Sequence, residues 1–241
     1  MEKVLDVYKR PFDPRHPVIC MDESPKQLIA ETRIPVPALP GQTAKYDYEY
    51  RRCGMCNIFI VCEPLAGTRT VKVTERKTKL DWAYLVEEIA DQNESAEKIT
   101  LVMDNLNTHN PGSLYEAFPP NKAKALWERF EFVYTPKHGS WLNIAEIELN
   151  VLTGQCLNRR IDDINIVRNE VTAWQKYRNN KNAKVDWQFT TEDARIKLSR
   201  LYPTLKSWRD TGISSIFVNF LPIPSEFFNL LLITSTTNFD A

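Results

Sequence analysis

The sequence has no long apolar segment and no net charge, and both absences narrow its function. No window approaches the roughly 18 consecutive apolar residues that a membrane-spanning helix needs, so we expect no membrane partner. Lysine plus arginine equals aspartate plus glutamate at 31 each. A module that only binds DNA is usually basic, so the balance argues against that class. A catalytic core whose acids are neutralised by metal remains open.

The chain also lacks a recognisable secretory segment and an even number of cysteines, of which it has five. Both features predict a reduced, cytoplasmic environment. Cys53 and Cys56 form a C-x-x-C pattern, but no second Cys or His pair follows at the spacing of a zinc site. A redox motif would precede a helix, whereas residues 57–61 have the composition of a strand. We therefore assign the pair neither role.

The sequence shows no internal repeat, and its 241 residues, 43% apolar and 26% charged, suit one sizeable soluble domain. Prolines at positions 11, 14 and 17 predict an irregular linker over residues 1–17. Residues 205–241 have no periodic pattern, so we expect a poorly ordered tail whose deletion leaves the melting temperature nearly unchanged. The domain would then span residues 18–204.

An early hairpin followed by alternating strands and helices predicts an α/β fold, in which helices flank both faces of a mixed sheet. This order matches the ribonuclease H-like architecture, which places the first and fourth strands side by side. The predicted strands are residues 18–21, 57–62, 69–73, 99–104 and 132–134. The predicted helices are residues 80–92, 113–118, 122–130, 144–157, 162–179 and 191–201.

Three acids occupy informative places in this scheme. Asp22 and Asp104 each close an apolar strand, and Glu146 lies at the start of a helix. An unpaired buried carboxylate is costly, so the acids suggest a shared partner such as a pair of hard divalent cations. Each acid alone also has a structural interpretation. Aspartate favours turns and helix caps, and Glu146 could complete a capping box with Asn143.

The segments around these acids resemble DDE-type transposases of the bacterial insertion-sequence branch of the mariner superfamily. The resemblance covers residues 4–203, and family members usually carry helix-turn-helix domains ahead of the catalytic domain, so we expect a chain shortened at its N-terminus. The matching segments are VICMDE (18–23), YDYEY (46–50), EPLAG (63–67), VMDNLNTH (102–109) and YTPKHGSWLNIAE (134–146).

The resemblance implies phosphoryl transfer on DNA, in which water cleaves the element's end and the freed 3′-hydroxyl attacks target DNA. Asp22 would bridge two Mg²⁺ ions, for which Mn²⁺ can substitute, while Asp104 and Glu146 would each hold one. Transposon ends and target DNA would be the partners, the chain would act as a homodimer, and the location would be the nucleoid of the bacterial cytoplasm.

Several polar residues near the acids are candidates for DNA contact, although each is equally consistent with a solvated loop or helix face. Glu23 and Glu148 rank below their neighbours because strand and helix geometry points them elsewhere. The candidates are Asn105, His109, Lys137, His138, Arg159 and Arg160.

Three other functions compete with a transposase. A catalytically silent remnant could associate with DNA or with an intact transposase. A nuclease acting on RNA–DNA hybrids would share the metal site. An aspartyl phosphotransferase would need a second aspartate two residues after Asp22, where this chain has Ser24.

Overall fold

The computed structural model describes residues 1–137 and 139–202. The chain divides into two units, Met1–Thr191 and Glu192–Ala241, and the sheet and the site described below lie in the first. The expectations for His138 and for the tail at residues 205–241 lie outside the described residues.

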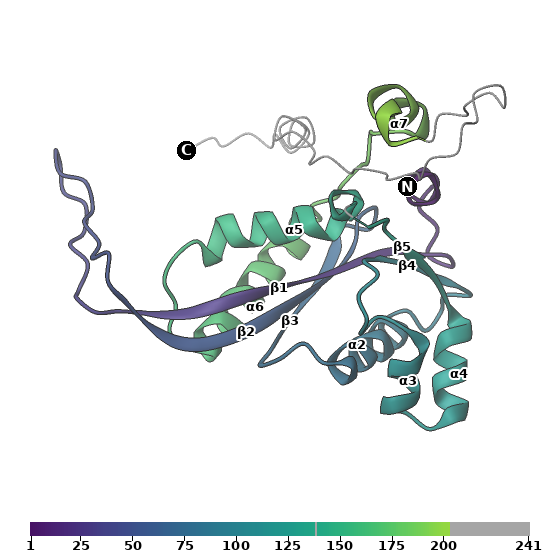
Figure 1. Ribbon diagram of the computed structural model, residues 1–241, viewed down its shortest axis with the longest axis horizontal. Helices are drawn as coiled ribbons and strands as arrows, with labels where there is room; N and C mark the ends of the chain where they lie inside the picture. The colour runs from purple at the N-terminus through teal and green to yellow at the C-terminus, as the bar shows by residue number, and fades with distance from the viewer. Residues whose placement is uncertain (138, 203–241) are drawn as a thin grey trace, which may run out of the picture. The chain divides into compact units, whose positions relative to one another are not determined.

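A five-stranded mixed sheet forms the centre of the first unit (Figure 1). Its order is β3-β2-β1-β4-β5, with β1, β2 and β3 antiparallel and with β4 and β5 parallel to their neighbours. The predicted ribonuclease H-like arrangement is confirmed, including the pairing of the first and fourth strands. The strands are β1 (Val18–Glu31), β2 (Tyr50–Glu63), β3 (Thr68–Thr74), β4 (Ile99–Met103) and β5 (Phe130–Tyr134).

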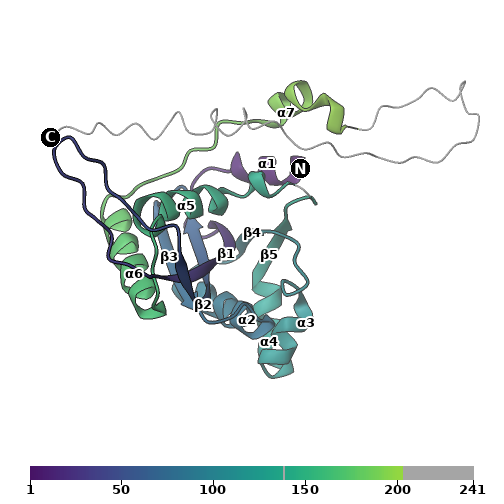
Figure 2. The ribbon, with the colours of Figure 1, turned by 60° about the vertical axis from the view of Figure 1, so that its left-hand side comes forward.

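Helices cover both faces of the sheet, with α2, α3 and α4 on one side and α5 and α6 on the other (Figure 2). None of the described helices is long and apolar enough to cross a membrane. The helices are α1 (Glu2–Tyr8), α2 (Lys79–Gln92), α3 (Pro111–Ala117), α4 (Pro120–Arg129), α5 (Ile144–Leu152), α6 (Ile164–Asn180) and α7 (Thr191–Lys197). Shorter helical segments are η1 (Ser140–Leu142), η2 (Thr153–Leu157) and η3 (Ser199–Leu201).

Side chains of β1 alternate between the two faces of the sheet, which decides where its acids point. Ile19 and Met21 are buried in the core that surrounds Trp82 of α2. Asp22 therefore faces the side of α5, while Glu23 faces the side of α2. The two adjacent acids therefore lie on opposite faces of the sheet.

The predicted linker is wrong in its first half, because residues 2–8 form the helix α1. Val4, Leu5 and Val7 of this helix are buried. All three prolines used for the prediction follow the helix, so they limit its end and do not prevent its formation. The segment before the first strand is consequently part of the packed structure.

The predicted end of the first strand at Asp22 is also wrong. β1 stays paired with β2 as far as Glu31↔Tyr50, whereas its parallel pairing with β4 ends at Cys20↔Val102. Two residues beyond that pair, the register brings Asp22 level with Asp104. Asp22 therefore lies where β4 stops and β1 continues.

Beyond the last pairing with β3, β1 and β2 continue as a two-stranded ribbon, defined here as residues 26–31 paired with residues 50–56. The segment that follows α5 holds this ribbon at three points. Lys26 Nζ donates to the Leu157 carbonyl at 2.7 Å, and the Ile29 amide donates to the Ile161 carbonyl at 2.7 Å. Arg160 pairs with Glu31 at 2.6 Å. Beyond these points, Ile34 and Tyr48 are exposed.

Candidate functional site

The structure brings the three predicted acids together at the level where β4 ends. Burial, followed by the charges of Asp104, Glu23 and Glu146, raises the pKa of Asp22 from 3.8 to about 7, and a hydrogen bond from the Glu23 amide opposes this rise. Asp104 and Glu146 are thus each near enough to act electrostatically on Asp22. In the absence of a cation, burial and the neighbouring negative charges disfavour the ionised form of Asp22.

Glu146 reaches the site because it lies in the first turn of α5. The Asn143 side chain caps this helix by accepting from the Ala145 amide at 3.2 Å. The Asn143 amide donates to the Ser140 carbonyl at 2.7 Å, so the capping-box interpretation of Glu146 is not what the structure shows. Burial raises the pKa of Glu146. Its Oε2 is buried without a hydrogen-bond partner among the described residues.

Asp104 has a second set of neighbours on the opposite side. Nδ1 of His109 lies 2.7 Å from its Oδ1, and Nε2 of the same ring lies 3.5 Å from Oε2 of Glu23. The ring stacks on Trp82 with 5.6 Å between centroids. His109 is 1% exposed, which argues against the predicted contact with DNA and gives it the role of holding Asp104.

The carboxylates on the α5 side have the ligand chemistry that a divalent cation prefers. Asp22, Asp104 and Glu146 supply carboxylate oxygens, the ligands that Mg²⁺ and Mn²⁺ prefer, and one of these oxygens is buried without a partner. Among the described residues, the group of three whose ligand atoms all lie within 4.8 Å of one another is instead Glu23, Asp104 and His109. There, however, Lys77 Nζ is 3.6 Å from Glu23, so a lysine already partners that carboxylate.

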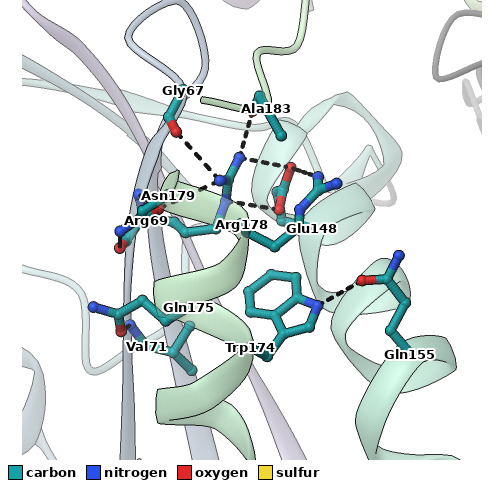
Figure 3. Close-up of polar contacts among 10 residues, drawn as sticks. All are labelled: Gly67, Arg69, Val71, Glu148, Gln155, Trp174, Gln175, Arg178, Asn179 and Ala183. Carbon is teal, nitrogen blue, oxygen red and sulfur yellow. Dashed lines mark hydrogen bonds and ion pairs between the residues drawn. The ribbon is translucent and has the colours of Figure 1, made fainter. Parts of the chain in front are cut away.

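Glu148 is adjacent in sequence to the site but serves a different purpose (Figure 3). It is 1% exposed and receives Arg69 Nε at 3.0 Å and Arg178 Nη2 at 3.0 Å. Asn179 extends this network by accepting from the Arg69 amide at 3.0 Å and donating to the Arg69 carbonyl at 2.8 Å. The network joins α5 and α6 to β3, so the lower rank of Glu148 as a site residue agrees with its surroundings.

The remaining candidates for DNA contact divide by their partners. Asn105, which directly follows Asp104, and Lys137 are exposed. Arg159 pairs with Glu170 at 2.6 Å. Arg160, already bonded to Glu31, also donates to the carbonyls of residues 47 and 49, both at 2.9 Å, so it holds the ribbon. Arg159 is exposed like Asn105 and Lys137, whereas Arg160 is only partly exposed.

Tyr8 is a site neighbour that the sequence interpretation missed. Its hydroxyl lies 2.8 Å from the Leu142 carbonyl and 3.3 Å from the Ile144 amide, on either side of the residue that caps α5. The two partners are more than 130 positions away, and no local pattern around Tyr8 indicates such a contact.

A ribonuclease H-like sheet with clustered acids at the level of its central strands defines the class of this domain. The DDE superfamily endonuclease family matches residues 17–168, and the chain belongs to that family. A search of curated proteins found no match.

The fold also agrees with that of a solved structure. A Mos1 transposase paired-end complex with left transposon end is 16% identical, with a TM-score of 0.51 over 77% of this chain and 53% of that chain. A Mos1 strand transfer complex is 16% identical, with a TM-score of 0.48 over 73% of this chain and 51% of that chain. The chain thus spans about half the length of these relatives. At such identity the likeness shows the fold alone.

Proposed function

We propose that this chain is the catalytic domain of an insertion-sequence transposase, which cuts DNA strands and joins them with the help of divalent metal. The observation that carries the proposal is the convergence of three acids from separate elements. The register of β1 and β4 brings Asp22 level with Asp104. Asn143, which caps the helix that carries Glu146, lies 3.3 Å from Asp22. Membership of the DDE superfamily endonuclease family supports the assignment of the reaction class. Residues 18–204 would form the catalytic domain.

Asp22, Asp104 and Glu146 would hold Mg²⁺ or Mn²⁺, with two ions as the expected number. Such ions polarise phosphate and stabilise the attacking and leaving oxygens of an in-line displacement. The protein itself supplies no covalent nucleophile. Its contribution is placement, because β1, the end of β4 and α5 each deliver one carboxylate from a packed element.

The proposed reaction has two steps, cleavage and transfer. In cleavage, water forms a bond to phosphorus while the bond to the 3′ oxygen breaks, which leaves a 3′-hydroxyl and a 5′-phosphate. In transfer, that 3′-hydroxyl forms a bond to a phosphorus of target DNA and displaces the target's own 3′ oxygen, which takes up the proton. Contacts to DNA would be mainly to the phosphate backbone, so we expect binding to weaken steeply with salt.

A supercoiled-plasmid nicking assay tests the proposal. The unmodified chain should nick plasmid with Mg²⁺ or Mn²⁺ and lose this activity in EDTA. Asp104→Asn keeps the shape of the side chain but removes its charge, so nicking should vanish while DNA binding persists. The matched control is Asp91→Asn, which makes the same change at an exposed position of α2 and should nick normally.

Two outcomes would count against the assignment. Nicking that survives EDTA or the Asp104→Asn substitution would refute the metal-dependent site. DNA binding without any nicking by the unmodified chain would favour a silent domain that acts through association.

A further inference from the structure

Asn143 is 0% exposed and lies between two of the clustered acids. Its Nδ2 donates to the Met21 carbonyl at 2.7 Å and lies 3.3 Å from Oδ2 of Asp22. Its Oδ1 meanwhile caps α5, the helix whose first turn carries Glu146. A single side chain thus ties the strand that bears one acid to the helix that bears another.

The side-chain amide of Asn143 has one more hydrogen-bonding group than a helix cap requires. Serine and aspartate cap helices about as well as asparagine, because the cap uses only a side-chain oxygen. The NH2 group of the Asn143 side chain is a donor, and in this structure it donates to the Met21 carbonyl in β1 and faces the Asp22 carboxylate. The amide therefore has a role that capping does not explain.

Tyr8 holds the same turn from the other side. Its hydroxyl donates to the Leu142 carbonyl at 2.8 Å and accepts from the Ile144 amide at 3.3 Å, so it bonds both neighbours of Asn143. Its ring packs against Trp187 with 5.1 Å between centroids. Burial raises the pKa of Tyr8 well above its usual value, so the hydroxyl keeps the proton that it donates.

We propose that Asn143 and Tyr8 are positioning residues that fix Glu146 relative to Asp22, so that both carboxylates can hold one divalent cation. This inference rests on the proposed function. Tyr8 lies outside residues 17–168, so it would bring a segment beyond the family match into the site. Loss of a group that orients a ligand typically weakens metal affinity about 10–100-fold.

The test is a Mn²⁺ titration of the full chain, with free Mn²⁺ followed by electron paramagnetic resonance. Tyr8→Phe removes one oxygen, and Asn143→Ser keeps a capping oxygen but loses the amide donor. Each should raise the dissociation constant for Mn²⁺ about 10–100-fold. The control is Tyr115→Phe, which removes the same atom from a side chain that is 49% exposed and should leave the affinity unchanged.

Melting temperatures separate positioning from stability, and each titration is run well below the variant's melting temperature. In nicking assays, both variants should need more Mn²⁺ but approach the normal rate at saturation. A lower melting temperature with unchanged Mn²⁺ affinity would mean that the contacts only stabilise the fold, and would overturn the inference. If Asn143→Ser does not fold, Tyr8→Phe decides alone.

Asp104→Asn in the same titration distinguishes the two proposals. If this variant loses Mn²⁺ binding while Tyr8→Phe and Asn143→Ser bind normally, only the positioning inference fails. If the unmodified chain binds no Mn²⁺, or binds it equally well after Asp104→Asn, both the metal site and the inference fail.

Discussion

Replacing Asp22 by asparagine should stabilise the metal-free protein at alkaline pH, although it removes a proposed metal ligand. Burial and neighbouring acids raise the pKa of Asp22 from 3.8 to about 7. Because the pKa is higher in the folded than in the unfolded chain, the folded state holds an extra proton between about pH 4 and pH 7. Stability from this group is therefore lost as the pH rises through that window.

The size of the effect follows from the same values. Each tenfold change in proton affinity corresponds to about 1.4 kcal/mol, so ionised Asp22 costs on the order of 4 kcal/mol at pH 8. Asparagine carries no charge, but its single oxygen can keep only one of the contacts with the Glu23 amide and the Asn143 side chain. We therefore expect a net gain of about 2–4 kcal/mol.

Urea unfolding in EDTA at several pH values measures this gain. The stability difference between Asp22→Asn and the unmodified chain should be largest at pH 8 and should shrink as the pH falls toward 4. Mg²⁺ should stabilise the unmodified chain more than the variant. A variant that is less stable at pH 8, or a difference that ignores pH, would refute the electrostatic account. Asp91→Asn serves as the control.

Four further substitutions test the roles of individual residues. Glu146→Gln should abolish plasmid nicking without lowering the free energy of unfolding. Glu148→Gln should lower the free energy of unfolding, measured in urea, by about 3–5 kcal/mol, because two arginines lose a buried charged partner. The reverse pattern would exchange the roles of the two glutamates. His109→Gln should weaken Mn²⁺ affinity about 10–100-fold in the same titration, because Asp104 loses its support; unchanged affinity would remove that role. Gly67→Ala should destabilise by at least about 1–2 kcal/mol, because the residue has a φ of +74° and a Cβ would meet backbone at 2.9 Å; an equally stable variant would contradict the crowding.

The parts of the fold with strong local signals could be predicted from the sequence. β4 is a run of five buried residues, which its apolar composition indicates directly. The helix α2 begins at a capping box of Thr78 and Asp81, and its amphipathic pattern gave nearly the observed bounds. The start of α5 at Asn143, and with it the position of Glu146, follows from the same kind of local rule.

The parts that were missed lack such signals for physical reasons. β1 continues past its apolar start through the polar residues 22–27, which give no strand signal, and buries Leu28 and Ala30 only farther along. Tyr8 meets the turn before α5 across more than 130 positions, and a hydroxyl that bonds backbone places no demand on the partner's side chain. Glu23 was ranked low because it would point away from Asp22, and it does point to the other face of the sheet. On that face it lies beside His109.

The ribbon also limits the distance between Asp22 and Glu31, because both residues belong to the same strand. At about 3.3 Å per residue, its far end lies up to about 30 Å from the acid. Three attachments to the segment after α5 keep this spacing from varying freely. Any molecule that binds the exposed residues beyond Glu31 is thus held at a limited distance from Asp22, equivalent to about nine base pairs of duplex.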